Sequence, residues 1–192
     1  MNEQDFLVHL DINKFNINQE SLIKEVLNQA YLKYSNFFNP DIYSMDKTIK
    51  WLMEVEDWQA CDIDLENNLE CKKFYTQIKK LLDVDFLEVT TCRSLYQKAN
   101  QELIKHSHRR VPRQNHLCIN YICTNNNAPI NFTKYGDITY KFALLNSVEQ
   151  HSVPAYKEDR FLIGVQFRYI DDIATWQDVK ELLKNVSVNN KW

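Results

Sequence analysis

Residues 138–169 read ITYKFALLNSVEQHSVPAYKEDRFLIGVQFRY, and this stretch decides the predicted fold. It contains two short runs, ITYKFALLN and FLIGVQFRY, that are rich in the β-branched and aromatic residues favoured in strands. A polar segment with His151 and Arg160 separates the two runs. The stretch therefore predicts two strands joined by a segment that carries functional side chains.

The same pattern extends back from residue 138 to Phe86. Four more β-rich runs are separated by polar or turn-forming residues: FLEVTTCRSLYQKA, LIKHSH, HLCINYICT and INFTKY. Many short strands with turn signals between them are typical of a β-sandwich or barrel, and the regular βα alternation of an α/β protein is absent. We predict an α+β, mainly β protein: a double-stranded β-helix (jelly roll) with an N-terminal helical layer.

The N-terminal half is expected to support this core. A strand is predicted over residues 6–17, and an apolar stripe at helical spacing predicts a helix over 18–38 with Asn18 as its N-cap. A second amphipathic helix is predicted over 71–84, and residues 41–72 are expected to be irregular. Two smaller features are a possible short helix at Thr48–Met53 and an acidic run, Glu54–Glu70, interpreted as a solvated surface.

We expect one domain over residues 1–192. Within it, residues 1–85 form the helix-rich support and 86–170 the jelly-roll core, and 171–192 form a C-terminal helix, at about Thr175–Lys184, and a polar tail.

Composition excludes several classes of function. The chain has only two glycines, Gly136 and Gly164, and they are too far apart in sequence for a P-loop, so neither GxGxxG nor GxxxxGK can be written. The net charge of −3 argues against nucleic acid as the main partner. Five cysteines without a CxxC pair are expected to be free thiols in a reducing cytoplasm. No signal peptide and no apolar run of about 20 residues is visible, so we expect a cytoplasmic protein without a membrane partner.

Three of the five histidines lie in HSHRRVPRQNHL, residues 106–117. His106 and His108 are two positions apart, and alternate residues of a strand share a face. With His151, which lies about forty-five residues downstream, they can form a three-imidazole site for Fe, Zn, Cu or Ni. The alternatives are a solvated basic loop at 106–108 and a turn or core histidine at 151.

Nine residues after His151 comes Arg160, at the start of the last predicted strand. A planar guanidinium at that place can bind a carboxylate through two parallel hydrogen bonds. The alternative is a surface ion pair with Glu158 or Asp159.

These residues together resemble the iron- and 2-oxoglutarate-dependent oxygenases. That family has an HxD pair, a distal His and an Arg about ten residues further on. Here NQELIKHSH is similar to the first element and LLNSVEQHSVPAYKEDRFLIGVQF to the second, within residues 86–168. The resemblance implies metal ligation of Fe(II) by His106, His108 and His151. It also implies binding of 2-oxoglutarate by Arg160, with Tyr96 and Asn120 beside it, and a jelly-roll fold.

The chain departs from the family at His108, where the family has a carboxylate. Three imidazoles are similar to the site of cupin-type thiol dioxygenases, and the loss of a negative charge is expected to weaken Fe(II) retention. The site is therefore an active variant, a site for another metal, or a degenerate one. A different register is also open, because His9 and Asp11 form a literal HxD in the first predicted strand.

Three functions remain open from the sequence. The first is a 2-oxoglutarate-dependent oxygenase that hydroxylates a small-molecule or peptide substrate. The second is a cupin-like metal enzyme without 2-oxoglutarate, and the third is a non-catalytic binding module. A basic cluster of Arg109, Arg110 and Arg113 is either a solvated face or the entrance for an acidic substrate.

Overall fold

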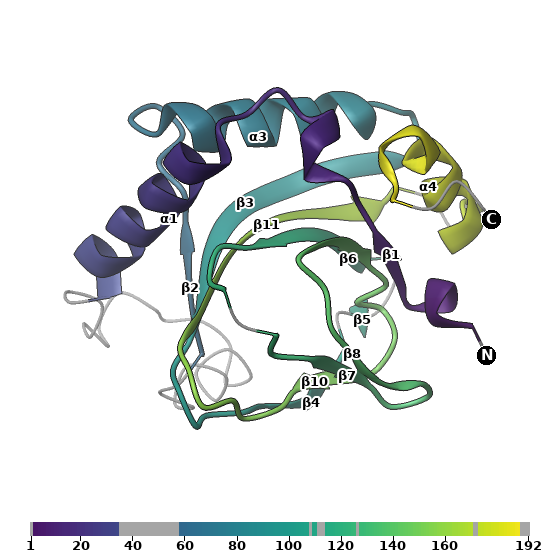
Figure 1. Ribbon diagram of the computed structural model, residues 1–192. Helices are drawn as coiled ribbons and strands as arrows, with labels where there is room; N and C mark the ends of the chain where they lie inside the picture. The colour runs from purple at the N-terminus through teal and green to yellow at the C-terminus, as the bar shows by residue number, and fades with distance from the viewer. Residues whose placement is uncertain are drawn as a thin grey trace.

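The protein consists of two antiparallel β-sheets that face each other, with helices on the outer side of the larger sheet (Figure 1). The structure, a computed structural model, describes residues 2–34, 58–107, 109–110, 114–125, 127–170 and 173–188. This arrangement confirms the predicted jelly roll with a helical layer. The predicted short helix at Thr48–Met53 lies outside the described residues.

The larger sheet has the strand order β1-β9-β6-β11-β3-β2, and β5 pairs with β6 in addition. All of its pairings are antiparallel. The strands are β1 (Leu7–His9), β2 (Trp58–Asp62), β3 (Leu87–Gln97), β5 (Arg109–Arg110), β6 (Gln114–Ile122), β9 (Phe142–Leu145) and β11 (Arg160–Tyr169).

The smaller sheet has the order β4-β10-β7-β8. Its strands are β4 (Leu103–His106), β7 (Ile130–Phe132), β8 (Gly136–Ile138) and β10 (His151–Val153). Consecutive strands cross between the sheets: β9 belongs to the larger, β10 to the smaller, and β11 to the larger again. The polar segment between the two apolar runs therefore lies opposite the strands that flank it in sequence.

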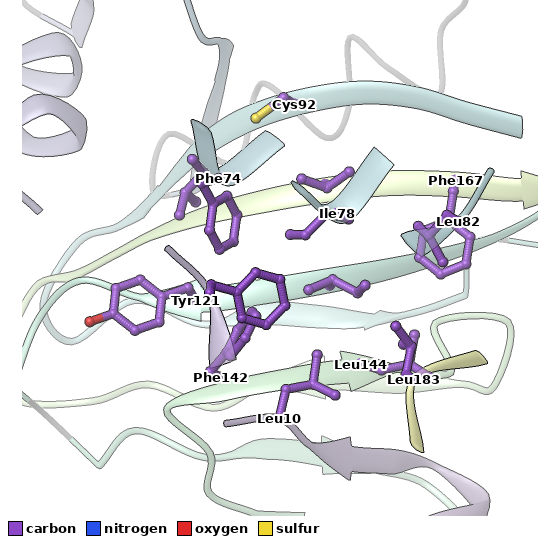
Figure 2. Close-up of a cluster of buried hydrophobic side chains, with 14 of the residues drawn as sticks. Leu10, Phe74, Ile78, Leu82, Cys92, Tyr121, Phe142, Leu144, Phe167 and Leu183 are labelled. Carbon is purple, nitrogen blue, oxygen red and sulfur yellow. The ribbon is translucent and has the colours of Figure 1, made fainter. Parts of the chain in front are cut away.

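Two helices, α1 (Gln19–Tyr34) and α3 (Leu69–Leu81), cover the outer face of the larger sheet (Figure 1). They pack on it through a group of buried apolar residues that we call the helix-side cluster. Its members are Val8, Leu10, Phe15, Leu22, Val26, Ile63, Cys71, Phe74, Ile78, Leu82, Leu87, Cys92, Leu117, Ile119, Tyr121, Cys123, Phe142, Leu144, Phe161, Ile163, Val165, Phe167, Val179 and Leu183. Figure 2 shows its centre, which contains Phe74 of α3, Tyr121 and Phe142. The ring centroid of Phe74 lies 6.4 Å from that of Tyr121 and 5.8 Å from that of Phe142. Burial of each such side chain contributes about 1.5–3 kcal/mol to folding, so the cluster fixes the sheet on which the site is built.

The two helices cap each other's N-termini. The Glu25 carboxylate on α1 accepts hydrogen bonds from the backbone N–H groups of Glu70 and Cys71 at 2.9–3.1 Å. In return the Glu70 carboxylate accepts from Asn18 N–H at 2.8 Å, and the pKa of Glu70 is lowered by its hydrogen bond from Lys73 and by this backbone bond. The prediction of Asn18 as an N-cap is confirmed, because its side chain accepts from Ser21 N–H at 2.9 Å.

Three predictions about the N-terminal half were wrong. The strand expected over 6–17 ends at His9, because Asp11 accepts from Asn13 N–H and starts the 3-10 helix η2 (Ile12–Lys14). The segment 41–72, predicted to be irregular, contains β2, which gains its hydrogen bonds from β3. The acidic run is not wholly solvated, since Glu70 is only 7 % exposed in its capping role.

The C-terminal helix is confirmed as α4 (Trp176–Leu182), which begins with a capping box between Thr175 and Asp178 and leads into η4 (Lys184–Val186). A further 3-10 helix, η1 (Glu3–Asp5), precedes β1. All five cysteines are buried and unpaired, as predicted. In the described ranges, no helix is both long enough and apolar enough to cross a membrane.

Between the two sheets lies a second group of buried side chains, which we call the inter-sheet cluster. Its members come from both sheets and from the segments that join them. They are Phe6, Leu7, Cys118, Ile122, Ile130, Phe132, Ile138, Tyr140, Ala143, Leu145 and Leu162. The predicted site residues are located relative to this cluster.

Candidate functional site

The predicted histidine pair comes together at the end of β4 and the start of β10. His106 and His151 are directly opposite each other in the antiparallel register, and their ring centroids are 4.4 Å apart. Opposite residues of an antiparallel pair point to the same face of the sheet. The ring of His151 also lies 5.7 Å from that of Phe132 in the inter-sheet cluster, so the pair faces the space between the sheets.

Both imidazoles are held by backbone carbonyls at the same ring nitrogen. Nδ1 of His106 lies 2.8 Å from Ile104 O, and Nδ1 of His151 lies 2.8 Å from Glu149 O. A carbonyl only accepts, so each Nδ1 carries the proton and the lone pair of the neutral ring is on Nε2. Metal-ligating histidines are commonly oriented by such a bond from the opposite nitrogen.

The two rings are also in the charge state that a metal requires. Burial, and then the neighbouring His106, lower the pKa of His151 to about 4. Burial likewise lowers the pKa of His106, against a smaller opposite effect of its bond to Ile104 O. Both are therefore neutral near pH 7, the form in which imidazole binds a cation.

This donor set fits two positions of a metal shell. No group of three or more His, Cys, Asp or Glu side chains that could hold a metal occurs among the residues that the structure describes. The third predicted ligand, His108, lies outside those residues, one residue beyond the described end of the β4 segment. The structure thus joins His106 with His151, and the ligand role of His108 stays a prediction.

Arg160 is buried and not at the surface. It is 1 % exposed, at the first position of β11, and it points to the same side as Leu162 of the inter-sheet cluster. Its guanidinium carbon lies 5.3 Å from the centroid of the Tyr140 ring, and Nη1 donates to Pro129 O at 3.5 Å. Since Tyr140 and Phe132 belong to the same cluster, Arg160 and the histidine pair face one interior.

Two N–H groups of Arg160, at Nε and Nη2, have no hydrogen-bond partner within the described residues. These two groups share one edge of the planar guanidinium, which we call the Arg160 edge. It is the edge that binds both oxygens of a carboxylate at once. A buried cation left in this state is costly, so it marks a place for an anion.

Asn120 is brought to Arg160 through Tyr140. Asn120 Nδ2 lies 3.4 Å from the hydroxyl of Tyr140, and the Tyr140 ring packs against the Arg160 guanidinium. Gly164, opposite Asn120 on β11, makes this possible, since a Cβ atom there would lie 2.6 Å from Asn120 Oδ1. Burial raises the pKa of Tyr140, so its hydroxyl keeps its proton.

Sequence reasoning missed Tyr140 and Gln97. Gln97 is the register partner of Arg160 on β3, is 2 % exposed, and donates from Nε2 to Gln101 O and Pro154 O. No motif marks either residue. The only available signal for Tyr140 was its place at the start of a predicted strand.

Tyr96 is not brought to the site. It pairs with Phe161, stacks on that ring at 4.6 Å and donates its hydroxyl hydrogen to Asp159. Phe161 belongs to the helix-side cluster, so Tyr96 lies on the opposite face of the larger sheet from Arg160. The alternative pair is also engaged elsewhere: His9 Nε2 contacts Glu3 at 2.9 Å, and Asp11 caps η2.

Comparisons with known proteins agree with the fold. A prolyl hydroxylase from Trichoplax adhaerens, in complex with a hypoxia inducible factor oxygen degradation domain peptide fragment, superposes with a TM-score of 0.60, at 13 % identity, over 92 % of this chain and 85 % of that one. A Pseudomonas putida prolyl-4-hydroxylase gives 0.56 at 13 % identity, over 79 % and 88 %. The viral collagen prolyl hydroxylase of Paramecium Bursaria Chlorella virus-1 gives 0.56 at 8 % identity, over 86 % and 91 %.

At these identities the likeness establishes the double-stranded β-helix fold. No family model and no curated protein matches the sequence.

Proposed function

We propose that this protein is an Fe(II)- and 2-oxoglutarate-dependent oxygenase that hydroxylates a small-molecule or peptide substrate. One observation carries the proposal. A buried arginine, whose carboxylate-binding edge has no partner among the described residues, faces the same interior as two neutral imidazoles with ring centroids 4.4 Å apart. An anion site and a metal-binding pair in one interior fit a ligand that has an acid at one end and metal-binding oxygens at the other.

Each residue has a defined part in this function. The Arg160 edge binds the distal carboxylate of 2-oxoglutarate, while Tyr140 packs under the guanidinium and Asn120 holds Tyr140. His106 and His151 hold the metal through Nε2, with position 108 as the third ligand. Iron, once bound with 2-oxoglutarate and dioxygen, supplies the oxidising chemistry. The protein orients the reactants and excludes water through the inter-sheet cluster.

His108 distinguishes this site from one with two histidines and a carboxylate. A neutral ligand in place of an anionic one lowers the negative charge of the metal shell, so we expect weaker retention of Fe(II). His108→Asp restores the acid and is expected to tighten Fe(II) binding.

A peptide is one of the two substrate classes in the proposal. It is supported by a neighbour of the same fold that was solved with a peptide fragment bound.

The test begins with protein purified without chelators under anaerobic conditions. We expect stoichiometric iron by elemental analysis, thermal stabilisation by Mn(II) with 2-oxoglutarate, and slow conversion of 2-oxoglutarate to succinate. His151→Ala is expected to abolish metal binding. Arg160→Met is expected to keep the metal and lose the effect of 2-oxoglutarate. Arg168→Met, which removes a surface ion pair with Glu88, is the matched control.

Two results would replace the proposal with an alternative. Metal binding and activity that persist in Arg160→Met without 2-oxoglutarate would indicate a cupin-like enzyme. Absence of metal, with no stabilisation by Mn(II) and 2-oxoglutarate together, would indicate a non-catalytic module.

A further inference from the structure

Gln97 presents a fixed hydrogen-bond acceptor beside Arg160. Its Nε2 donates to two backbone carbonyls, Gln101 O at 2.7 Å and Pro154 O at 3.0 Å. Rotation of the amide by 180° would place Oε1 against both carbonyl oxygens, so these bonds determine which atom is oxygen. Oε1 is buried and has no donor among the described residues.

The β-sheet register places the Gln97 side chain beside that of Arg160. Gln97 and Arg160 are opposite each other on β3 and β11, so their side chains leave the same face of neighbouring strands. Both are almost fully buried. The interior therefore presents two donors from Arg160 and one acceptor from Gln97, on side chains that leave the same face of neighbouring strands.

A simple carboxylate cannot satisfy this set of atoms. Its two oxygens accept from the Arg160 edge, but an ionised carboxylate has no hydrogen to donate to Gln97 Oε1. Placed beside Oε1, it would leave a buried acceptor unpaired and bring two partial negative charges together, which is unfavourable in a dry interior.

We propose that Gln97 determines specificity at this site. The acid preferred there carries an O–H or N–H donor on the carbon next to its distal carboxylate. This inference rests on the proposed function, in which Arg160 binds that carboxylate. Among 2-oxo diacids, Gln97 selects a 4-hydroxy-2-oxo diacid over 2-oxoglutarate, because the hydroxyl group of the ligand donates to Gln97 Oε1 while its distal carboxylate binds the Arg160 edge.

The experiment compares 4-hydroxy-2-oxoglutarate with 2-oxoglutarate by isothermal titration calorimetry on the full chain loaded with Mn(II). Each enantiomer of the hydroxy acid is titrated separately. One added hydrogen bond in a buried site is expected to give a Kd about three- to tenfold lower for the better hydroxy enantiomer. The ratio of the two Kd values is the readout, so a change common to both ligands does not affect it.

Two variants and a control test the assignment to Gln97. Gln97→Met removes the acceptor at similar length and is expected to bring the ratio to one. Gln97→Glu places a carboxylate beside Arg160 and is expected to weaken both acids more than tenfold, because the new anion occupies the Arg160 edge. Ser94→Ala, on the opposite face of β3 beside Cys61, is expected to keep the ratio of the unmodified protein.

The results separate this inference from the function it rests on. If both acids bind with equal Kd in the unmodified protein, Oε1 is satisfied in another way and only the specificity role is overturned. The same holds if Gln97→Met keeps the preference, or if Gln97→Glu binds both acids normally. If neither acid binds to the metal-loaded protein, the proposed acid site fails and the specificity role with it.

Discussion

Arg160→Met is expected to stabilise the protein in the absence of ligand. The reason is that Arg160 is buried with two N–H groups that lack partners among the described residues. A site prepared for an anionic ligand carries this cost until the ligand binds. Methionine has a similar length and no polar hydrogen, so it fills the space without the cost.

The size of the effect follows from the contacts that are lost and gained. Removal of two unsatisfied buried N–H groups gains about 1–3 kcal/mol each. Against this stand the cation–π contact with Tyr140, about 0.5–2 kcal/mol, and the long bond to Pro129 O, about 0.5–1.5 kcal/mol. The net is a gain of about 2 kcal/mol in the free energy of unfolding, similar to the gain known for replacing buried ion pairs with apolar residues. For a chain of this size, that raises Tm by about 4–8 °C.

The assay is urea or thermal unfolding followed by circular dichroism, on metal-free protein without 2-oxoglutarate or any other carboxylic acid ligand. Arg93→Met is the control, since it removes an exposed ion pair with Asp62 and is expected to lower stability by less than about 1 kcal/mol. A fall in Tm of more than about 4 °C for Arg160→Met would refute the reasoning, because it would mean that the guanidinium is already satisfied in the ligand-free protein.

Three further predictions concern other parts of the molecule. Gly164→Ala places a Cβ atom 2.6 Å from Asn120 Oδ1, so we expect the free energy of unfolding to fall by about 1–3 kcal/mol through overpacking. We also expect weaker binding of 2-oxoglutarate in calorimetry. An unchanged Kd would contradict the role of Asn120 in holding Tyr140. Glu25→Ala removes the cap of α3 and is expected to lower the free energy of unfolding in urea by about 1–2 kcal/mol. Glu20→Ala, at an exposed position of α1, is the control and is expected to have little effect. Equal losses in the two variants would argue against the capping role. All five cysteines are buried, and burial raises the pKa of Cys92, Cys118 and Cys123 to about 12. Mass spectrometry should therefore find no iodoacetamide adduct in the native protein at pH 8 and five adducts after unfolding. Rapid labelling of the native protein would show that the core opens.

The histidine pair could be predicted because its chemistry is encoded locally. His106 lies in the strand-like run LIKHSH, and His151 lies in the polar segment just after the run ITYKFALLN. The short β-rich runs around them limit the fold to a few β architectures. In such a fold, strands that alternate between two sheets bring residues about forty-five positions apart into register. The same pattern could not show that β2 exists, since a run of only five residues, WQACD, between acidic stretches becomes a strand only through hydrogen bonds from β3.

By itself, the sequence determined the type of each strongly patterned element, the free state of the cysteines and the candidate roles of His106, His151 and Arg160. These depend on side-chain chemistry and on periods of two or 3.6 residues, which are local properties. Only the tertiary structure decided that Arg160 is buried with an edge that no described residue pairs, that Gln97 is opposite it, and that Tyr96 faces the helices instead. Register causes the difference, because a shift of one residue moves every side chain of a strand to the other face, and register is fixed by packing of the whole sheet.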